Sequence, residues 1–289
     1  MNRFTEMRGL IKIPRLPFFG GKGDATGISE SLKHTNWEKP KGVIISLGLP
    51  VALVYFWYFA SKTGLLHRSI LPSPAMFMDS LKYLLESGTL AGHLSISIIR
   101  VLKGFAVGAG IGIITGILMG IFPRVNQTVA LLFGVLMPIP QIGWIPLLIL
   151  WCGIGETTKI VVIALGTFWS VLLNTHGGIR NVDQKLIEVA NVLEKNKLFI
   201  ITRIILPASM PAIITGIRLG FGNAWRSVVA AEMLAASKGI GFLIAYSREL
   251  SQPDIMIVGL LSIGFIGVLI DRAMLLFQKR ALRWNTGAS

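Results

Sequence analysis

Long apolar stretches separated by short polar segments constrain the fold of this chain more than any other feature. Each stretch is close to the ~20 residues that an α-helix needs to cross a bilayer. A bilayer interior offers no water to unpaired backbone N–H and C=O groups, so such segments span it as helices. Composition agrees with an all-α integral membrane protein, since 53% of the residues are hydrophobic and 15% are charged. About six spans are expected, at residues 43–60, 95–122, 128–155, 159–174, 212–230 and 255–277.

The distribution of charge predicts how these spans are oriented. The chain carries 28 lysines and arginines against 14 acidic residues. The basic residues are concentrated in residues 1–41, in residues 183–207 and in the C-terminal tail, and such segments face the cytoplasm. We therefore expect both termini inside, residues 1–41 as a cytoplasmic N-terminal extension and residues 42–289 as the transmembrane domain. The positive charge suits anionic membrane lipid, and no nucleic acid partner is expected.

Several kinds of chemistry find little support in the sequence. A single cysteine, Cys152, excludes an internal disulfide, and the four histidines show no metal-ligand spacing. The chain has no nucleophile–base constellation and no phosphate-binding P-loop motif. The sequence therefore argues against a metal site, a membrane enzyme or an ATPase.

Glycines recur at every fourth position in the second stretch. They form a helix face without side chains, and such a face lets another helix approach closely. We expect tight helix packing, and a smooth face would also permit sliding during a conformational cycle. Arg100 and Lys103 lie toward the outer end of this span, where their long side chains are expected to reach the membrane interface. The glycines are Gly104, Gly108, Gly112, Gly116 and Gly120.

Prolines interrupt the third apolar stretch at Pro138, Pro140 and Pro146. Broken helix at membrane depth is tolerated only where protein or a water-filled cavity satisfies the freed backbone groups. Gln141 and Trp144 are therefore candidate residues of a translocation pathway. The alternative is a proline kink that serves packing alone.

The polar segment 183–207 contains two short helical patterns. Both are too short to span a bilayer, which predicts two amphipathic helices between membrane spans. Asn196 is able to adopt the left-handed conformation of a turn between them. Pro207 is expected to end the second helix because it has no N–H group. The apolar positions are Leu186, Val189, Ala190 and Leu193 in the first pattern and Leu198, Ile201 and Ile205 in the second.

This segment resembles the cytoplasmic coupling loop of binding-protein-dependent ABC importer permeases. Residues 188–190 match the family's Glu-Ala-Ala, and residues 204–207 match its Ile-x-Leu-Pro at the family's spacing. Val189 replaces the first Ala, and Glu194 stands where the family has a Gly. Asn196, two residues later, could supply the turn geometry that this Gly provides. The alternative is an amphipathic helix on the membrane surface without a partner. The resemblance implies docking on a separate ATPase subunit through Glu188, Ala190, Leu193, Ile204, Leu206 and Pro207.

Further motifs, in the family's order over about residues 65–285, resemble the nitrate, sulfonate, taurine and bicarbonate branch of these permeases. They are Leu-Pro-Ser-Pro at 71–74, Arg-Val-Leu at 100–102, Gly-Phe at 104–105, Pro-Ile-Pro at 138–140, Trp-Ile-Pro at 144–146, Gly-Ile-Gly-Glu at 153–156, Ala-Trp at 224–225 and Ala-Ala-Glu-Met at 230–233.

The resemblance implies an assembly and a function. The implied assembly is a permease homodimer in a prokaryotic inner membrane, with an extracytoplasmic binding protein and two cytoplasmic ATPase subunits that hold ATP and Mg. The implied function is import of a small anion, with an aliphatic sulfonate or taurine favoured over nitrate or bicarbonate. No cofactor is expected in this chain. A non-ABC membrane channel is the rival function, and it would not need a coupling loop.

Polar residues in and beside the fifth stretch are further candidates for the pathway. A charge inside a membrane is costly and usually faces protein or a cavity, so Arg226 would attract an anion. The alternative is that Arg226 and Glu232 pair with each other or anchor the span at the interface. The predicted pathway residues are Gln141, Trp144, Asn223, Trp225, Arg226 and Glu232.

Overall fold

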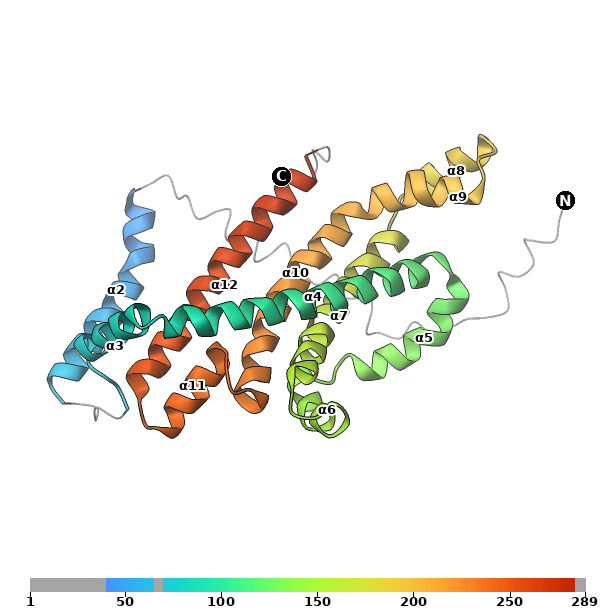
Figure 1. The fold of residues 1–289 in the computed structure, drawn as a ribbon. Helices are drawn as coiled ribbons and strands as arrows, with labels where there is room; N and C mark the ends of the chain where they lie inside the picture. The colour runs from blue at the N-terminus through green and yellow to red at the C-terminus, as the bar shows by residue number, and fades with distance from the viewer. Residues whose placement is uncertain (1–39, 65–69, 284–289) are drawn as a thin grey trace. The chain divides into compact units, whose positions relative to one another are not determined.

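The computed structural model describes residues 40–64 and 70–283, with side chains from residue 48 onward. All but the last two residues of the expected N-terminal extension lie outside the described residues. Every regular element in the described part of the chain is helical (Figure 1). The chain divides into two compact units, residues 1–59 and 60–289.

The helices follow one another along the chain with short connections. α2, Pro40–Lys62, belongs mainly to the first unit and covers the first predicted span. The second unit contains α3 Pro74–Glu86, α4 Thr89–Ile121, α5 Pro123–Leu136, the 3-10 helix η3 Gln141–Trp144, α6 Ile145–Cys152, α7 Glu156–Arg180, α8 Gln184–Val192, α9 Lys197–Ile200, the π-helix η4 Ile201–Ile205, α10 Leu206–Ala235, α11 Ile240–Glu249 and α12 Pro253–Ala281.

Four helical segments in the described ranges are long and apolar enough to cross a membrane. The pair α5 and η3–α6 bends by 89° and makes a fifth span if it crosses as one broken unit. The bend follows Leu136, where the prolines predicted an interruption. An all-helical membrane fold is therefore confirmed, and the first span, at residues 43–60, stays a prediction. The four segments are Thr89–Ile121, Glu156–Arg180, Lys197–Ala235 and Pro253–Ala281.

Residues 123–126, between the second and third predicted spans, were expected to form a short inner turn, but this is wrong, since only Phe122 separates α4 from α5. Pro123 instead opens α5. The reason is that the first turn of a helix leaves its N–H groups unpaired in any case, so the donor that proline lacks is not missed there.

The glycine face of α4 packs against α7, as predicted. A Cβ atom placed on Gly104 would lie 2.6 Å from the side chain of Ile163, closer than real Cβ atoms come to other heavy atoms. α10 approaches the same helix closely at Gly220, whose Cβ would lie 2.8 Å from Val171. Glycine is thus required at these contacts because only a bare backbone allows such short distances between helices.

We expect Gly108→Ala to lower the free energy of unfolding by about 1–3 kcal/mol, the usual cost of overpacking a tight contact. The added Cβ would overlap the Ala164 carbonyl oxygen and would lie 2.8 Å from Thr167. Denaturation of the purified protein in mixed micelles measures the effect. Gly110→Ala is the matched control, since nothing lies within 4 Å of its Cβ position and alanine favours the helix. Equal stability of the two variants would contradict the packing argument.

The core of the second unit lies where α4, α7 and α10 pack together. Val101, Ile163, Phe221 and Trp225 form one buried apolar cluster from these helices, and Ile263 of α12 packs against it. α11 and α12 contact each other and α10 (Figure 1). This arrangement fixes the relative positions of the polar residues that the spans carry.

Candidate functional site

α8 exposes apolar side chains at one end of the spans. The Asp183 carboxylate accepts a hydrogen bond from the Lys185 N–H at 3.0 Å and so caps the start of the helix. Ala190 is only 3% exposed and faces the rest of the chain. Three other apolar residues of α8 and the residue after it point outward instead, and we call them the docking surface because the resemblance predicts docking in this segment. They are Leu186, Val189, Val192 and Leu193, with exposed fractions of 49%, 59%, 83% and 61%.

In the turn after α8, the residue with left-handed backbone conformation is Glu194, which occupies the position of the family's glycine. Glu194 has φ of 51°, and the Lys195 N–H donates to the Ala190 carbonyl at 3.0 Å, as in a Schellman motif. Asn196 is not left-handed, contrary to the prediction. It caps α9, where its side-chain oxygen accepts from the Phe199 N–H at 2.7 Å. The hydrogen bonds that close α8 therefore set the geometry of the turn.

Pro207 does not end the second amphipathic helix, and that prediction is wrong. α9, η4 and α10 form one helical run, Lys197–Ala235. The Leu206 N–H reaches back to the Ile201 carbonyl, which closes a π-turn, and Pro207 falls in the first turn of α10. Proline is tolerated at that place because the first turn does not use its N–H. The loop is therefore joined to the fifth predicted span without a break.

The residues that the resemblance assigns to ATPase coupling differ in exposure. α8 contacts η4, so both parts of the motif lie in one region of the fold. Their coupling roles stay a prediction. Glu188, Leu193 and Pro207 are exposed, Ile204 and Leu206 are half-buried, and Ala190 is buried.

Polar side chains line the contact between α7 and α10, and we call this contact the polar seam. The Asn223 amide donates to the Ser170 hydroxyl at 2.5 Å, and the Ser227 hydroxyl donates to the Asn223 carbonyl at 2.8 Å. Gln141 on η3 reaches the same contact, since its amide nitrogen lies 3.3 Å from the Cβ position of Gly166. The structure therefore brings Gln141 and Asn223, two predicted pathway residues, to neighbouring positions.

The two tryptophans predicted for the pathway lie elsewhere. Trp225 is 5% exposed, packs in the core and donates from its indole N–H to the Ile263 carbonyl at 3.2 Å. Trp144 is half-buried against the apolar cluster that contains Ile145 and Val162. Both side chains stabilise helix contacts in this conformation.

Arg226 is exposed although it lies within a membrane span. Its Nε donates to the Gly222 carbonyl one turn earlier at 3.3 Å. No carboxylate among the described residues pairs with its guanidinium. The alternative of an Arg226–Glu232 pair is wrong, since Glu232 pairs with Arg100. A charge at this depth requires protein or water beside it.

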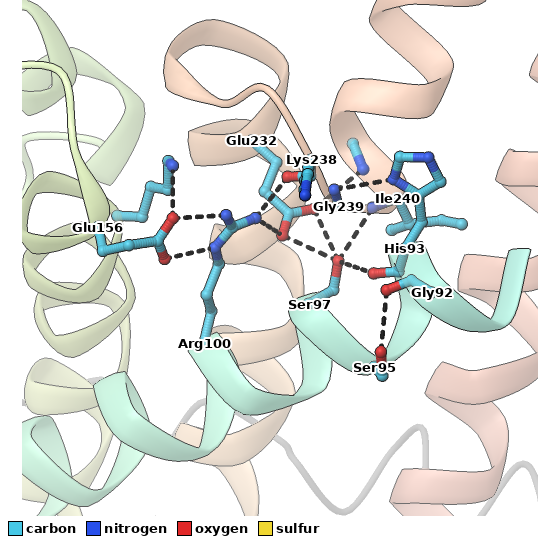
Figure 2. A network of polar contacts seen from close by, with 12 residues as sticks. Gly92, His93, Ser95, Ser97, Arg100, Glu156, Glu232, Lys238, Gly239 and Ile240 are labelled. Atoms are coloured by element: carbon cyan, nitrogen blue, oxygen red, sulfur yellow. Dashed lines mark hydrogen bonds and ion pairs between the residues drawn. The ribbon is translucent and has the colours of Figure 1, made fainter. Parts of the chain in front are cut away.

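A buried ion network holds the other end of the spans together. Figure 2 shows the Arg100 side chain between two carboxylates. Its Nε and Nη2 donate to Glu156 at 2.7 and 2.6 Å, and its Nη1 donates to Glu232 at 2.8 Å. The Lys159 ammonium lies 2.9 Å from Glu156. Two cations and two carboxylates balance, which a buried site requires.

The same network fixes the connection between α10 and α11. Glu232 is fully buried and accepts hydrogen bonds from the Ser97 hydroxyl at 2.8 Å and from the Gly241 N–H at 3.0 Å. Gly239 has φ of 117°, and any Cβ there would overlap the Glu232 carboxylate. Arg100 donates from Nη1 to the Lys238 carbonyl at 2.5 Å. The network therefore joins α4, α7, α10 and the loop to α11 (Figure 2).

The sequence reasoning missed this network. Arg100 was expected to reach the interface, but it is 5% exposed, because burial against two carboxylates satisfies its charge without water. The signal that could have found it was Arg100 inside the second predicted span together with Glu232 just beyond the fifth, since charged residues in or beside spans commonly pair.

The network and the docking surface lie at opposite ends of the spans. The network gathers the first residues of α7 and the last residues of α10, whereas α8 and α9 connect the other ends of these two helices (Figure 1). The described residues contain no group of three or more His, Cys, Asp or Glu side chains that could hold a metal. The described residues thus form a helical membrane protein with one broken segment and a short loop helix that exposes apolar side chains.

Comparison with known proteins identifies the family. Residues 108–283 match the family described as binding-protein-dependent transport system inner membrane component, and this chain belongs to that family. It is therefore a multi-pass inner membrane protein and the permease component of an ABC transporter. Its ATPase and its substrate-binding protein are separate components, and ATP hydrolysis is not a function of this chain.

Named relatives place the chain in one branch of the family. SsuC of Bacillus subtilis (strain 168), named for aliphatic sulfonates transport, is 38% identical over 89% of this chain and 93% of SsuC. TauC of Escherichia coli (strain K12), a taurine transport system permease protein, is 30% identical over 86% of this chain and 92% of TauC. NrtB of Synechocystis, a nitrate import permease protein, is 33% identical over 81% of this chain and 86% of NrtB.

Solved structures show the same fold. An inward-facing structure of the MetNI methionine ABC transporter superposes with a TM-score of 0.54 at 17% identity, over 69% of this chain and 96% of that chain. A crystal structure of an amino acid ABC transporter with histidines gives a TM-score of 0.59 at 14% identity, over 69% of this chain and 97% of that chain. At these identities the likeness concerns the fold alone.

Proposed function

We propose that this permease forms the translocation pathway for a small oxyanion. The observation that carries the proposal is Arg226, an exposed cation within a span that has no carboxylate partner among the described residues. A guanidinium left without a carboxylate partner at membrane depth is costly, and a passing anion offsets that cost. The neighbouring polar seam supplies the neutral amide and hydroxyl groups of Gln141, Asn223 and Ser170.

An aliphatic sulfonate or taurine is the favoured substrate. The names of SsuC and TauC support this choice, and SsuC is the more similar of the two. Nitrate or bicarbonate is the second candidate, supported for nitrate by the name of NrtB. A non-ABC channel is excluded, because the chain belongs to a family of ABC transporter permeases.

The working assembly is a homodimer of this permease with two ATPase subunits and one binding protein outside. ATP and Mg belong to the ATPase subunits. We place both termini and the α8–α9 loop on the cytoplasmic side, as the basic residues of these segments favour. The docking surface then faces the ATPase, and the buried ion network lies at the outer end.

The continuity of α9, η4 and α10 supports a simple mechanism of coupling. One helical run, Lys197–Ala235, carries the end of the loop, Asn223 and Arg226. When the ATPase subunits close on ATP and move α8, they move the start of this run as well. The continuous helical run passes that displacement to the pathway residues on α10, and access to them changes from one side of the membrane to the other. In this mechanism Glu232 keeps α10 attached to α4 beside the pathway, because its buried carboxylate pairs with Arg100.

We expect Arg226→Ala to lower uptake of an aliphatic sulfonate by about tenfold to a hundredfold, as loss of one charge-assisted hydrogen bond would. Uptake is measured in vesicles that contain the permease and ATPase, with the binding protein supplied. Parallel assays with taurine, nitrate and bicarbonate identify the substrate.

Arg248→Ala is the matched control for Arg226→Ala. Arg248 is also an exposed arginine, but it lies on α11 outside the spans. The control should transport normally, and both complexes should assemble. Full uptake by the Arg226 variant would leave this arginine a structural residue and remove the main support for the pathway.

A further inference from the structure

Glu156 is the exposed member of an otherwise buried ion network. Its side chain is 57% exposed, whereas those of its partners Arg100 and Lys159 are 6% and 5% exposed. Figure 2 shows its carboxylate at the edge of the network, on the opposite side of Arg100 from Glu232. A half-exposed carboxylate on two buried cations leaves the network more readily than a buried one would, because water replaces its lost contacts.

The contacts of Glu156 are those that a free oxyanion would make. One of its oxygens accepts from Arg100 Nη2 at 2.6 Å and from Lys159 at 2.9 Å, and the other accepts from Arg100 Nε at 2.7 Å. Arginine binds carboxylates and tetrahedral oxyanions in the same bidentate geometry, with two parallel N–H···O hydrogen bonds. A sulfonate group can therefore satisfy all the donors that Glu156 satisfies.

The segment before Glu156 has free space beside its backbone, although the Gly153 carbonyl accepts a hydrogen bond from the Thr158 hydroxyl at 2.6 Å. Gly153 has φ of 76°, Ile154 is 80% exposed, and a Cβ on Gly153 or Gly155 would meet nothing within 4 Å. Glu232 differs, because it is fully buried and any Cβ on Gly239 would overlap it. Only one of the two carboxylates is thus free to move without disturbing packed atoms.

We propose that Glu156 occupies an oxyanion-binding site and that the transported oxyanion takes its place on Arg100 and Lys159. This inference rests on the proposed function, because it assumes that the transported molecule is a singly charged oxyanion. The exchange keeps the network neutral, since one negative charge leaves Arg100 and Lys159 for water and another arrives. No covalent bond changes.

The position of this site on α7 connects it with the polar seam. Lys159, Gly166, Ser170 and Asn174 follow one another at helical spacing, so they lie on one face of α7. An oxyanion bound at Lys159 is therefore at the end of the face that carries the seam. The site would receive the oxyanion at the outer end, before it reaches Asn223 and Arg226.

Binding of methanesulfonate to the intact permease–ATPase complex in nanodiscs tests the proposal. Isothermal titration calorimetry gives the dissociation constant for the wild type and for Glu156→Gln. We expect Glu156→Gln to bind about tenfold more tightly, because glutamine keeps the shape of the side chain but no longer competes as an anion. Adding Lys159→Met to this variant should reverse the gain, since it removes one of the two cations.

Two further variants keep the test decisive. Glu249→Gln changes an exposed carboxylate on α11 and should bind like the wild type. If Glu156→Gln does not assemble, Glu156→Asp replaces it, and its shorter side chain should also raise the affinity. An unchanged or weaker affinity in the assembled Glu156 variant would overturn the site. Sulfonate uptake by wild-type vesicles is measured separately. Absence of uptake in that assay would count against the proposed function and not against oxyanion binding at Arg100 and Lys159.

Discussion

Replacing Val189 with aspartate should abolish substrate uptake while the permease still folds and inserts into the membrane. Val189 lies on the docking surface of α8 and is 59% exposed, so a charge there meets water in the isolated chain. If α8 docks on the ATPase as proposed, the same charge would be buried in that contact, and an unpaired buried charge is strongly unfavourable. We therefore expect loss of the ATPase from the complex and uptake at the background level.

Co-purification of the ATPase and uptake in vesicles measure this effect together. Asn191→Asp is the matched control, because Asn191 is also exposed on α8 but does not belong to the apolar docking surface. Normal uptake by the Val189 variant, with the ATPase bound, would show that the docking surface lies elsewhere. A bulky residue at Ala190 is a poorer test, since Ala190 is 3% exposed and a larger side chain would disturb α8 itself.

Local patterns in the sequence predicted the elements that depend on neighbouring residues. The spacing of the glycines in α4 indicated a face without side chains, and α7 packs on that face. Prolines around Gln141 indicated a broken helix, and the chain bends by 89° there. These features follow from backbone geometry within a few residues, which is why the sequence alone was sufficient.

Other features depend on contacts that the sequence does not display. Arg100 meets Glu232 across 132 positions of sequence, and no local periodicity links them. The apolar pattern of α8 predicted one apolar face of the helix, but it did not predict that Ala190 on that face would be buried by the rest of the chain. At Glu194 the hydrogen bonds of the helix end outweigh the preference of the residue type for other conformations. Pro207 lies within one helical run and does not end a helix, because a π-turn precedes it.

The largest effect on stability is expected from breaking the buried pair of Arg100 and Glu232. Arg100→Leu leaves the Glu232 carboxylate fully buried without its cation, with only Ser97 and Gly241 as donors. Removing one partner of a buried ion pair costs about 3–5 kcal/mol of folding free energy. Denaturation in mixed micelles should therefore show a far less stable protein than the wild type.

The double variant Arg100→Leu with Glu232→Leu distinguishes the cost of an unpaired buried charge from the cost of losing the packing of the Arg100 side chain. Both buried charges are absent, and replacement of a buried pair by apolar residues is often neutral or stabilising. The double variant should therefore recover most of the stability that Arg100→Leu loses, although Glu156 keeps only Lys159 as its partner. A double variant as unstable as the single one would mean that Arg100 acts through its contacts with Glu156 and the Lys238 carbonyl. In that case the pair with Glu232 would not be what holds α4 to α10.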